Sequence, residues 1–358
     1  MSLNVLVAMS GGLDSSVAAA LLKEQGYSVA GAIMTTWAGG ASQAQGRRHG
    51  CYGPGEDEDV EDARRVAATL GIPFHVFDLS REYKAEVLDH FCRGYLSGET
   101  PNPCVRCNRR IKFDALPRKA RSAGIAFDCF ATGHYARAGR DGAAGRYLLK
   151  KGKDSNKDQS YFLSFLSQEQ LARTLFPVGD YTREEVRKMA ADFGLDVGSK
   201  PKSQDFMSGG YSSLIQTAAP GPILDETGNV LGRHWGIPFY TIGQRKGLGI
   251  SSKEPLHVIG IDLERNAIIV GRKERLYGDE LVASALNWIA VEKLDQPAVV
   301  KALIRYRHPE AGAVLTPLDG DKVHVRFREP QMSITPGQAV VFYDGDTVLG
   351  AGVIQKVG

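Results

Sequence analysis

Strand-like and helix-like patterns of apolar residues alternate along the first part of the chain. Short apolar runs have the length of buried strands at residues 4–9, 27–34, 73–79 and 127–132. Apolar positions recur at helical spacing in residues 15–25, 59–70, 82–97 and 108–123. The box Thr182-x-x-Glu185 predicts the start of a further helix that ends near Gly194. Strands that alternate with helices predict an α/β fold with a doubly wound parallel sheet.

The pattern changes after about residue 208. Residues 209–273 are rich in glycine and proline and contain short β-like pieces such as "WGIPFYTIG" and "LHVIGIDL". From about Leu276, alternating apolar and polar positions predict strands, and Asp344-Gly345 is a hairpin turn signal. Residues 39–55 contain few apolar side chains and are predicted to form a loop. We therefore predict three domains: an α/β domain at 1–207, a small central domain at 208–275 and a β-barrel at 276–358.

The composition is that of an ordinary globular protein, with 43% hydrophobic and 24% charged residues. No apolar run approaches the roughly 20 residues that a membrane span needs. Five scattered cysteines do not make the framework of a disulfide-rich secreted protein. We therefore expect a cytoplasmic protein without membrane contact. The net charge of +3 neither requires nor excludes nucleic acid, because binding depends on a local basic surface.

A glycine-rich stretch, "MSGGLDSS" (9–16), joins the first predicted strand to the first predicted helix. Open α/β sheets bind ligands at this edge, where the strands end. Gly11 and Gly12 allow backbone N–H groups to approach a pyrophosphate, and the helix N-terminus adds partial positive charge. Asp14 is placed to bind Mg²⁺ or to cap the helix, and hydroxyl donors lie beside it at Ser10, Ser15 and Ser16. The stretch is not a Walker A loop. A simple glycine turn with a helix cap is the alternative, but this combination at the first strand–helix junction favours phosphate binding.

The same stretch resembles the pyrophosphatase-loop signature of the N-type ATP enzymes. These enzymes cleave ATP between its α and β phosphates and adenylate a carbonyl oxygen. The resemblance implies adenylyl transfer rather than γ-phosphoryl transfer.

Longer motifs occur in a fixed order: "TPNPCVRCNRRIKF" (100–113), "ATGHYAR" (131–137), "DSNKDQSYFL" (154–163), "GQRKGLGI" (243–250) and "TPGQAVVFY" (335–343). Together they resemble the tRNA-specific 2-thiouridylase (MnmA) family over nearly the whole chain. The resemblance implies a nucleotide-binding α/β domain, a small central domain and a C-terminal β-barrel. It also implies that ATP and Mg²⁺ are used to replace O2 of the wobble uridine in a tRNA anticodon stem-loop. The sulfur would come from a donor protein or from free sulfide.

Site residues follow from the resemblance position by position. The catalytic positions are Cys107, which matches the family's catalytic cysteine, with Cys104 and Asp14. The ATP-binding positions are Ala8, Met9, Ser10, Gly11, Gly12, Leu13, Asp14, Ser15, Met34 and Gly133. The tRNA-contacting positions are Asn102, Pro103, Cys104, His134, Lys157, Asp158, Gln159, Arg305, Tyr306 and Gln338.

The implied chemistry explains the use of cysteine. Once O2 of the uridine is adenylated, a sulfur nucleophile attacks C2 and AMP leaves. A thiolate is nucleophilic and can carry a persulfide. Four basic neighbours could lower a thiol pKa as well as contact tRNA: Arg106, Arg109, Arg110 and Lys112. For Arg110 and Lys112 the alternative is a solvated helix face.

One position departs from the family pattern. The family's second cysteine lies in a segment that resembles "KPKSQDFMSGG" (200–210), where this chain has Met207. A thioether forms neither a persulfide nor a disulfide, so three alternatives remain open. Cys104 could replace the missing partner of Cys107. Cys51 could join Cys104 and Cys107 in holding a 4Fe–4S cluster with one open iron site. In the third, Cys107 is a relic, and free sulfide attacks directly or activity is lost. Three cysteines within plausible reach favour the cluster, and the missing second ligand pair disfavours Zn²⁺.

Two other functions stay open. A pyrophosphatase-loop ligase with a nitrogen nucleophile would keep the phosphate loop but leave the tRNA-like motifs unexplained. A tRNA-binding homologue that has lost catalysis would be consistent with Met207. The remaining cysteines, Cys92 in a helix and Cys129 in an apolar strand, are expected to be buried packing residues.

Overall fold

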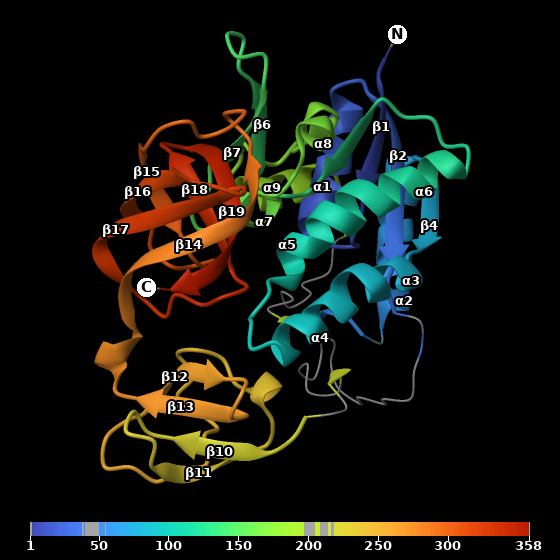
Figure 1. Ribbon diagram of the computed structural model, residues 1–358. Coiled ribbons are helices and arrows are strands. Elements are labelled where there is room, and N and C mark those ends of the chain that lie inside the picture. Colours follow the sequence, from blue (N-terminus) through green and yellow to red (C-terminus); the bar gives the residue numbers. More distant parts are fainter. Residues whose placement is uncertain are drawn as a thin grey trace. The chain divides into compact units, whose positions relative to one another are not determined.

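The computed structural model describes residues 2–37, 39, 50–53, 55–196, 205–207, 214–215 and 218–357, with only the backbone at 50, 205–207 and 356–357 (Figure 1). The chain divides into two compact units. The first contains Met1–Val87, Cys104–Gly210 and Asp346–Val348. The second contains Leu88–Pro103, Tyr211–Gly345 and Leu349–Gly358. The predicted boundaries at 207/208 and 275/276 stay a prediction, since the chain around the first of them lies mostly outside the described residues.

A five-stranded sheet forms the centre of the first unit. Its strands are β1 (Asn4–Ala8), β2 (Ser28–Thr35), β4 (Phe74–Asp78), β5 (Cys129–Thr132) and β8 (Thr174–Leu175). They lie in the order β4-β2-β1-β5-β8, and all four neighbouring pairs are parallel. The chain first builds outward from β1 through β2 to β4, and then returns to β5 on the other side of β1. The doubly wound sheet is therefore confirmed, and the direction of winding reverses between β1 and β5, where such sheets bind ligands.

Helices cover this sheet. The longer ones are α1 (Leu13–Glu24), α2 (Glu56–Leu70), α6 (Leu116–Ser122) and α9 (Arg183–Asp192), and the short ones are α7 (Ser160–Leu163) and α8 (Gln168–Ala172). Apolar residues of α1, α2 and α9 share one core with β1 and β2. The predicted ends are confirmed at two helices: Gly71 follows α2 with a φ of +61°, and Thr182 and Glu185 form the capping box of α9.

Two predicted helices contain π-helical segments. The first comprises α3 (Ser80–Tyr83), the π-helix η1 (Lys84–Leu88) and α4 (Asp89–Leu96). The second comprises α5 (Pro103–Cys107), the π-helix η2 (Asn108–Ala115) and α6. It begins earlier than predicted, at Pro103, because proline suits a first helical position, where no N–H donor is needed. Cys104 and Cys107 therefore lie on a helix, three residues apart, directly before a π segment. Such segments often occur at functional sites.

A six-stranded barrel forms the larger part of the second unit (Figure 1). Its strands are β14 (Tyr277–Trp288), β15 (Ala298–Leu303), β16 (Ala311–Leu318), β17 (Lys322–Met332), β18 (Ala339–Asp344) and β19 (Thr347–Val357). The order is β14-β17-β16-β15-β18-β19, and pairing of β14 with β19 closes the barrel. Its interior is apolar and contains Val300, Leu315 and Phe342. The predicted β-barrel is confirmed, and Gly345 takes a φ of +56° in the predicted turn.

A smaller four-stranded sheet in the second unit has the order β11-β10-β13-β12. The strands are β10 (Gly221–Leu224), β11 (Val230–His234), β12 (His257–Asp262) and β13 (Ala267–Gly271). "LHVIGIDL" is a strand as predicted, but "WGIPFYTIG" is not. It contains the 3₁₀ turn η4 (Ile237–Phe239) after Gly236, whose φ is +146°. Pro238 cannot donate a ladder hydrogen bond, so Ile237 and Pro238 are buried in a turn, whereas Trp235 is exposed. A second 3₁₀ turn, η5 (Lys273–Leu276), precedes the barrel.

Sequence patterns missed two strand pairs of the first unit. The hairpin β6 (Ala136–Arg140) and β7 (Tyr147–Lys151) pairs through Lys150 with Thr347. The short strands β3 (Gly50–Tyr52) and β9 (Asp205–Met207) pair in parallel, so residues 50–52 of the predicted loop are a strand. Most of that loop lies outside the described residues. Within the described ranges, no helix has the length and hydropathy needed to cross a membrane.

Candidate active site

The loop after β1 is held tightly against helix α2. Gly11 has a φ of +69°, and a Cβ atom there would lie 2.7 Å from the carbonyl oxygen of Asp59 and 2.9 Å from Cβ of Asp62. Only glycine fits this conformation and this space. Gly12 follows as the N-cap of α1, so Asp14 lies in the first turn and does not cap the helix. The capping alternative for Asp14 was wrong.

Hydroxyl groups stabilise the loop from within. Ser15 Oγ accepts a hydrogen bond from Ser10 N at 3.1 Å, and both Ser15 Oγ and Ser16 Oγ donate to the carbonyl oxygen of Gly12, at 3.1 Å and 2.9 Å. Ser15 and Ser16 are buried, whereas Ser10 is exposed. Two of the three predicted hydroxyl donors therefore position the loop backbone, and Ser10 is the one that solvent reaches.

Gly133 lies directly against the start of α1. It follows β5, and a Cβ atom there would lie 2.5 Å from both the carbonyl carbon of Asp14 and the amide nitrogen of Ser15. Ala8 at the end of β1 is level with Ala32 in β2 and Thr132 in β5. Met34 lies two residues beyond Ala32. The structure therefore brings the predicted ATP-binding positions to the same edge of the sheet, at the point where its winding reverses.

Asp14 is bound by two residues that the sequence analysis did not single out. Tyr135 Oη donates a 2.8 Å hydrogen bond to Asp14 Oδ1, and Arg183 Nη1 contacts both carboxylate oxygens. Burial and the Asp14 charge raise the pKa of Tyr135, so its hydroxyl remains a donor. Tyr135 lies inside the motif "ATGHYAR", which could have indicated it. Arg183 carries no comparable local signal, because its partner is 169 positions away in the sequence.

Three cysteines form a cluster in the first unit. Cys104 and Cys107 lie on α5, and Cys51 lies on β3. Burial raises the pKa of Cys104 to about 12 and that of Cys107 to about 11, and the proximity of Cys51 contributes to both increases. The expected lowering of these pKa values was wrong. Lys112 does lower them, but burial outweighs it.

The neighbouring arginines are engaged elsewhere. Arg106 Nη2 is 2.7 Å from Glu86 Oε2, its Nε donates to the carbonyl oxygen of Glu86, and Arg110 Nε is 3.9 Å from the same carboxylate. Arg109 lies over the ring of Phe165 at 5.9 Å.

The five cysteines all lie within the described residues, and none is in a disulfide. Cys92 and Cys129 are half-buried rather than fully buried as expected.

Two stacked tyrosines, Tyr52 and Tyr83, lie beside the cluster. Tyr83 is buried, and burial, with smaller contributions from the nearby Cys107, Cys51 and Cys104, raises its pKa. Its ring stacks on Tyr52 with centroids 5.4 Å apart. Tyr52 in turn pairs with Met207 across β3 and β9, so Cys51 lies one residue from the position opposite Met207. Among the described residues, no three His, Cys, Asp or Glu side chains are arranged to hold a single metal ion.

Comparison with known proteins identifies the family. Family models match three consecutive parts: the tRNA methyl transferase HUP domain at residues 3–207, the tRNA methyl transferase PRC-barrel domain at 212–272 and the aminomethyltransferase beta-barrel domain at 278–354. A tRNA-specific 2-thiouridylase MnmA of Moorella thermoacetica is 52% identical over 98% of this chain and 99% of its own length. That of Heliobacterium modesticaldum is 49% identical over 99% and 93%. The chain belongs to the tRNA-specific 2-thiouridylase family. The resemblance drawn from the sequence motifs is confirmed.

Of the residues that the 2-thiouridylase motifs assign to tRNA contact in the first unit, several have internal partners. His134 Nδ1 is 2.8 Å from Thr132 Oγ1, and its ring packs on Phe113 at 5.9 Å. Burial, with a smaller effect from Lys112, lowers its pKa well below the usual value. Gln159 Oε1 accepts from the backbone N–H of Tyr135 at 2.9 Å. The Gln159 side chain therefore helps to place Tyr135.

Asp158 is also engaged within the fold. Its Oδ1 accepts from Gly152 N at 2.9 Å and Ser160 N at 3.1 Å, and its Oδ2 from Ser160 Oγ at 2.7 Å. Lys157 donates its backbone N–H to Asp154. The tRNA-contacting roles of these residues stay predictions.

In the second unit, two segments far apart in the 2-thiouridylase sequence are joined. The backbone N–H of Thr100 donates to Pro336 O at 2.8 Å, and Gln338 Nε2 donates to Thr100 O at 2.7 Å. A Cβ atom on Gly337 would lie 2.8 Å from Thr100 N. The segment that carries Asn102 and Pro103 is therefore fixed to the loop that carries Gln338.

Arg305 contacts the same barrel loop. Its Nη2 donates to Ser333 O at 3.3 Å and to Thr335 Oγ1 at 3.2 Å. Within the described part of the chain, no carboxylate pairs with Arg305. Tyr306, next in sequence, lies under the guanidinium of Arg307 at 5.8 Å. Of the predicted tRNA-contacting residues, Asn102, Pro103, Arg305, Tyr306 and Gln338 therefore come from segments joined to one loop region of the second unit.

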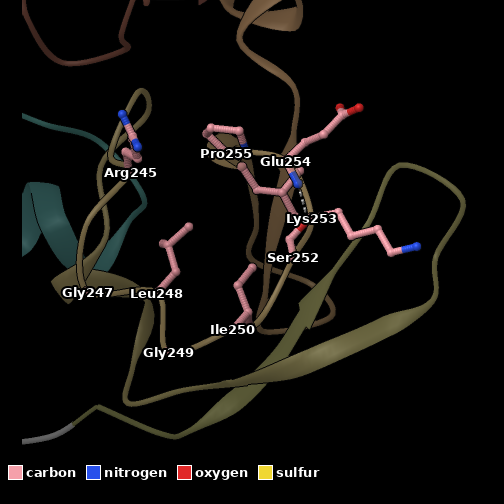
Figure 2. A pocket seen from close by; sticks show the side chains of 10 residues that line it. Arg245, Gly247, Leu248, Gly249, Ile250, Ser252, Lys253, Glu254 and Pro255 are labelled. Carbon is pink, nitrogen blue, oxygen red and sulfur yellow. Dashed lines mark hydrogen bonds between the residues drawn. The ribbon is translucent and has the colours of Figure 1, made fainter.

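The 2-thiouridylase motif "GQRKGLGI" lines a hollow of about 370 Å³ in the second unit (Figure 2). Leu248 and Ile250 form apolar parts of its wall, with Pro255 and Leu256 from the following segment. No residue of the predicted catalytic or ATP-binding sets lines this hollow.

Proposed function

We propose that this protein is an ATP-dependent tRNA sulfurtransferase that converts the wobble uridine to 2-thiouridine. The observation that carries the proposal is the meeting of the Gly11–Gly12 loop, Asp14 and Gly133 where the winding of the sheet reverses. This edge of the sheet and the Cys104–Cys107 pair belong to the same compact unit. Membership of the tRNA-specific 2-thiouridylase family supports both the substrate and the reaction.

The first half-reaction uses the loop after β1. Backbone N–H groups near Gly11 and the N-terminus of α1 bind the phosphates of ATP. We assign Mg²⁺ binding to the Asp14 carboxylate, because this ion prefers oxygen ligands. Uridine O2 attacks the α-phosphorus, the bond to the β-phosphate oxygen breaks, and pyrophosphate leaves with the electron pair. The product is an adenylated uridine whose C2 is open to attack.

The second half-reaction replaces oxygen by sulfur. A sulfur nucleophile forms a bond to C2, the C2–O bond breaks, and AMP leaves. We propose that the sulfur is held at Cys51, Cys104 and Cys107, since these thiols are the cysteine cluster of the α/β unit. Bound by all three thiolates, a 4Fe–4S cluster would keep one iron without a protein ligand, available for sulfide. The three thiolates come from two separate elements, α5 and β3. This arrangement suits a cluster, because each thiolate would bind a different iron.

The test is an anaerobic preparation of the whole protein. Iron and acid-labile sulfide are measured, and the sample then receives unmodified tRNA, ATP, Mg²⁺ and sulfide. Nucleoside mass spectrometry detects 2-thiouridine. Product that forms only with near-stoichiometric iron supports the cluster. Product without iron assigns the sulfur to the Cys104–Cys107 pair or to free sulfide. The absence of product in both states would refute the proposed activity.

A further inference from the structure

Arg183 is fixed at the start of helix α9 by several contacts. Thr182 and Glu185 cap the helix, and the backbone N–H of Arg183 donates to Asp154 Oδ2 at 3.0 Å. The side chain crosses to Asp14 on α1 and is only 20% exposed. Because the backbone is held at both the cap and Asp154, the guanidinium is presented to the first turn of α1 rather than to solvent.

The guanidinium is incompletely satisfied. Nη1 contacts both oxygens of Asp14, which also accepts the hydroxyl of Tyr135. Arg183 Nε is buried and has no hydrogen-bond partner among the described residues. A guanidinium normally binds an oxyanion through two parallel N–H groups, and a buried donor without an acceptor costs free energy. The Arg183 guanidinium therefore has an unused N–H donor that can bind a further anionic oxygen.

Several carboxylates lie around the loop, and one of them, Asp62, is paired with Arg65. Helix α2 begins with Glu56, Asp57, Glu58 and Asp59, and Asp59 and Asp62 lie against Gly11. The side chain of Glu56 accepts from the backbone N–H groups of Thr36 and Trp37, which fixes its charge nearby. The phosphates of ATP need a positive charge beside them. Arg183 is a cation that contacts Asp14 in the first turn of α1.

We propose that Arg183 binds the β- and γ-phosphate oxygens of ATP and neutralises the pyrophosphate that leaves. This inference rests on the proposed adenylation reaction. Without nucleotide, Arg183 and Asp14 neutralise each other. With Mg²⁺ and ATP present, Asp14 becomes a ligand of the cation, and the Arg183 guanidinium, its Nε included, turns to the phosphates. When the α-phosphorus–oxygen bond breaks, the electron pair stays on pyrophosphate, and Arg183 stabilises that charge.

Binding of ATP and AMP to the full-length protein separates this role from a structural one. AMP lacks the two phosphates that Arg183 would bind. In calorimetric titrations with Mg²⁺, we expect Arg183→Gln to weaken ATP about tenfold, the size of one lost charge-assisted contact, and AMP less than about twofold. Arg183→Lys should recover part of the ATP affinity. The control is Arg187→Gln, which removes an exposed arginine from the same helix and should change neither affinity.

Each other outcome overturns the inference. Equal losses for ATP and AMP would mean that Arg183 only supports the fold around Asp14, and unchanged ATP affinity would mean that it does not contact the phosphates. If Arg183→Gln does not fold, Asp14→Asn/Arg183→Gln removes both charges together and is compared with Asp14→Asn under the same titration. The wild-type protein is assayed in parallel for tRNA-dependent AMP release. Failure there would refute the proposed function, while the ATP and AMP affinities would still decide the role of Arg183.

Discussion

Gln338 Nε2 donates a 2.7 Å hydrogen bond to the carbonyl oxygen of Thr100, 238 positions earlier in the chain. Both residues belong to the second unit. The bond fixes the segment that leads to Asn102 and Pro103, and Cys104 follows directly. Gln338, which the motif assigns to tRNA contact, therefore has a role in placing the segment next to the cysteine pair.

Replacing Gln338 by alanine should disturb that placement. Loss of one neutral hydrogen bond is worth about 1 kcal/mol, so we expect the KM for tRNA to rise roughly fivefold while ATP affinity is unchanged. Steady-state kinetics with varied tRNA measures the effect. Gln296→Ala, an exposed amide in the barrel unit, is the matched control. An unaltered KM in Gln338→Ala would show that the bond to Thr100 does not position a tRNA contact.

Arg305→Gln should flatten the salt dependence of tRNA binding. No carboxylate in the described part of the chain neutralises Arg305, so its charge is available to a phosphate. Each phosphate contact contributes about 0.9 to the slope of log affinity against log salt concentration for duplex nucleic acid, and about 0.7 for single strands. Filter binding at several salt concentrations gives the slope. Arg326→Gln, on an exposed strand position, is the control, and an unchanged slope in Arg305→Gln would remove the phosphate contact.

His134 should remain neutral at physiological pH. Burial lowers its folded pKa well below the ordinary 6.5, with a smaller contribution from Lys112. Below pH 6.5 the unfolded chain therefore binds a proton that the folded chain does not, and stability is lost as the pH falls toward the folded pKa. His134→Gln should reduce the difference between thermal midpoints at pH 7.5 and 5.5. His308→Gln is the control, and an identical pH dependence in wild type and His134→Gln would contradict the prediction.

Asp14 and Tyr135 should affect AMP formation to different degrees. Asp14→Ala removes the carboxylate at the phosphate loop and should abolish tRNA-dependent AMP release. Tyr135→Phe removes only the 2.8 Å hydrogen bond to Asp14, so we expect a loss of roughly fivefold. Thin-layer separation of labelled AMP measures both. Normal AMP release by Asp14→Ala would refute the assignment of the loop, and Tyr277→Phe, at an exposed tyrosine, controls for the substitution.

Cysteine variants separate the sulfur routes. Cys107→Ser should abolish 2-thiouridine formation while leaving tRNA affinity nearly intact, since a hydroxyl replaces the thiol. Cys51→Ser should also abolish it if three thiolates hold the sulfur. The matched control is Cys129→Ser, which changes a half-buried cysteine outside the cluster. Full activity in Cys51→Ser would restrict the route to Cys104 and Cys107, and full activity in Cys107→Ser would indicate direct attack by sulfide.

Local patterns were sufficient for most of the first unit. The end of α2 at Gly71 and the start of α9 at Thr182 depend on residues within one helical turn, so their sequence signals are reliable. The phosphate loop is likewise local, because glycine conformation and a helix N-terminus are set by neighbouring residues. The prediction of a strand for "WGIPFYTIG" was wrong because an apolar run does not by itself distinguish a strand from a turn. Only the packing of the folded chain decides between them.

The sequence by itself determined the family, the α/β sheet with its C-terminal barrel, and the position of the phosphate loop. Tertiary structure alone decided that Asp14 is bound by Arg183, that Gln338 holds Thr100, and that Cys51 approaches Cys104 and Cys107. It also reversed the expected pKa shift of the cysteines, because burial outweighs the charge of nearby Lys112. Contacts between residues more than fifty positions apart depend on how the whole chain packs, and no local pattern encodes them.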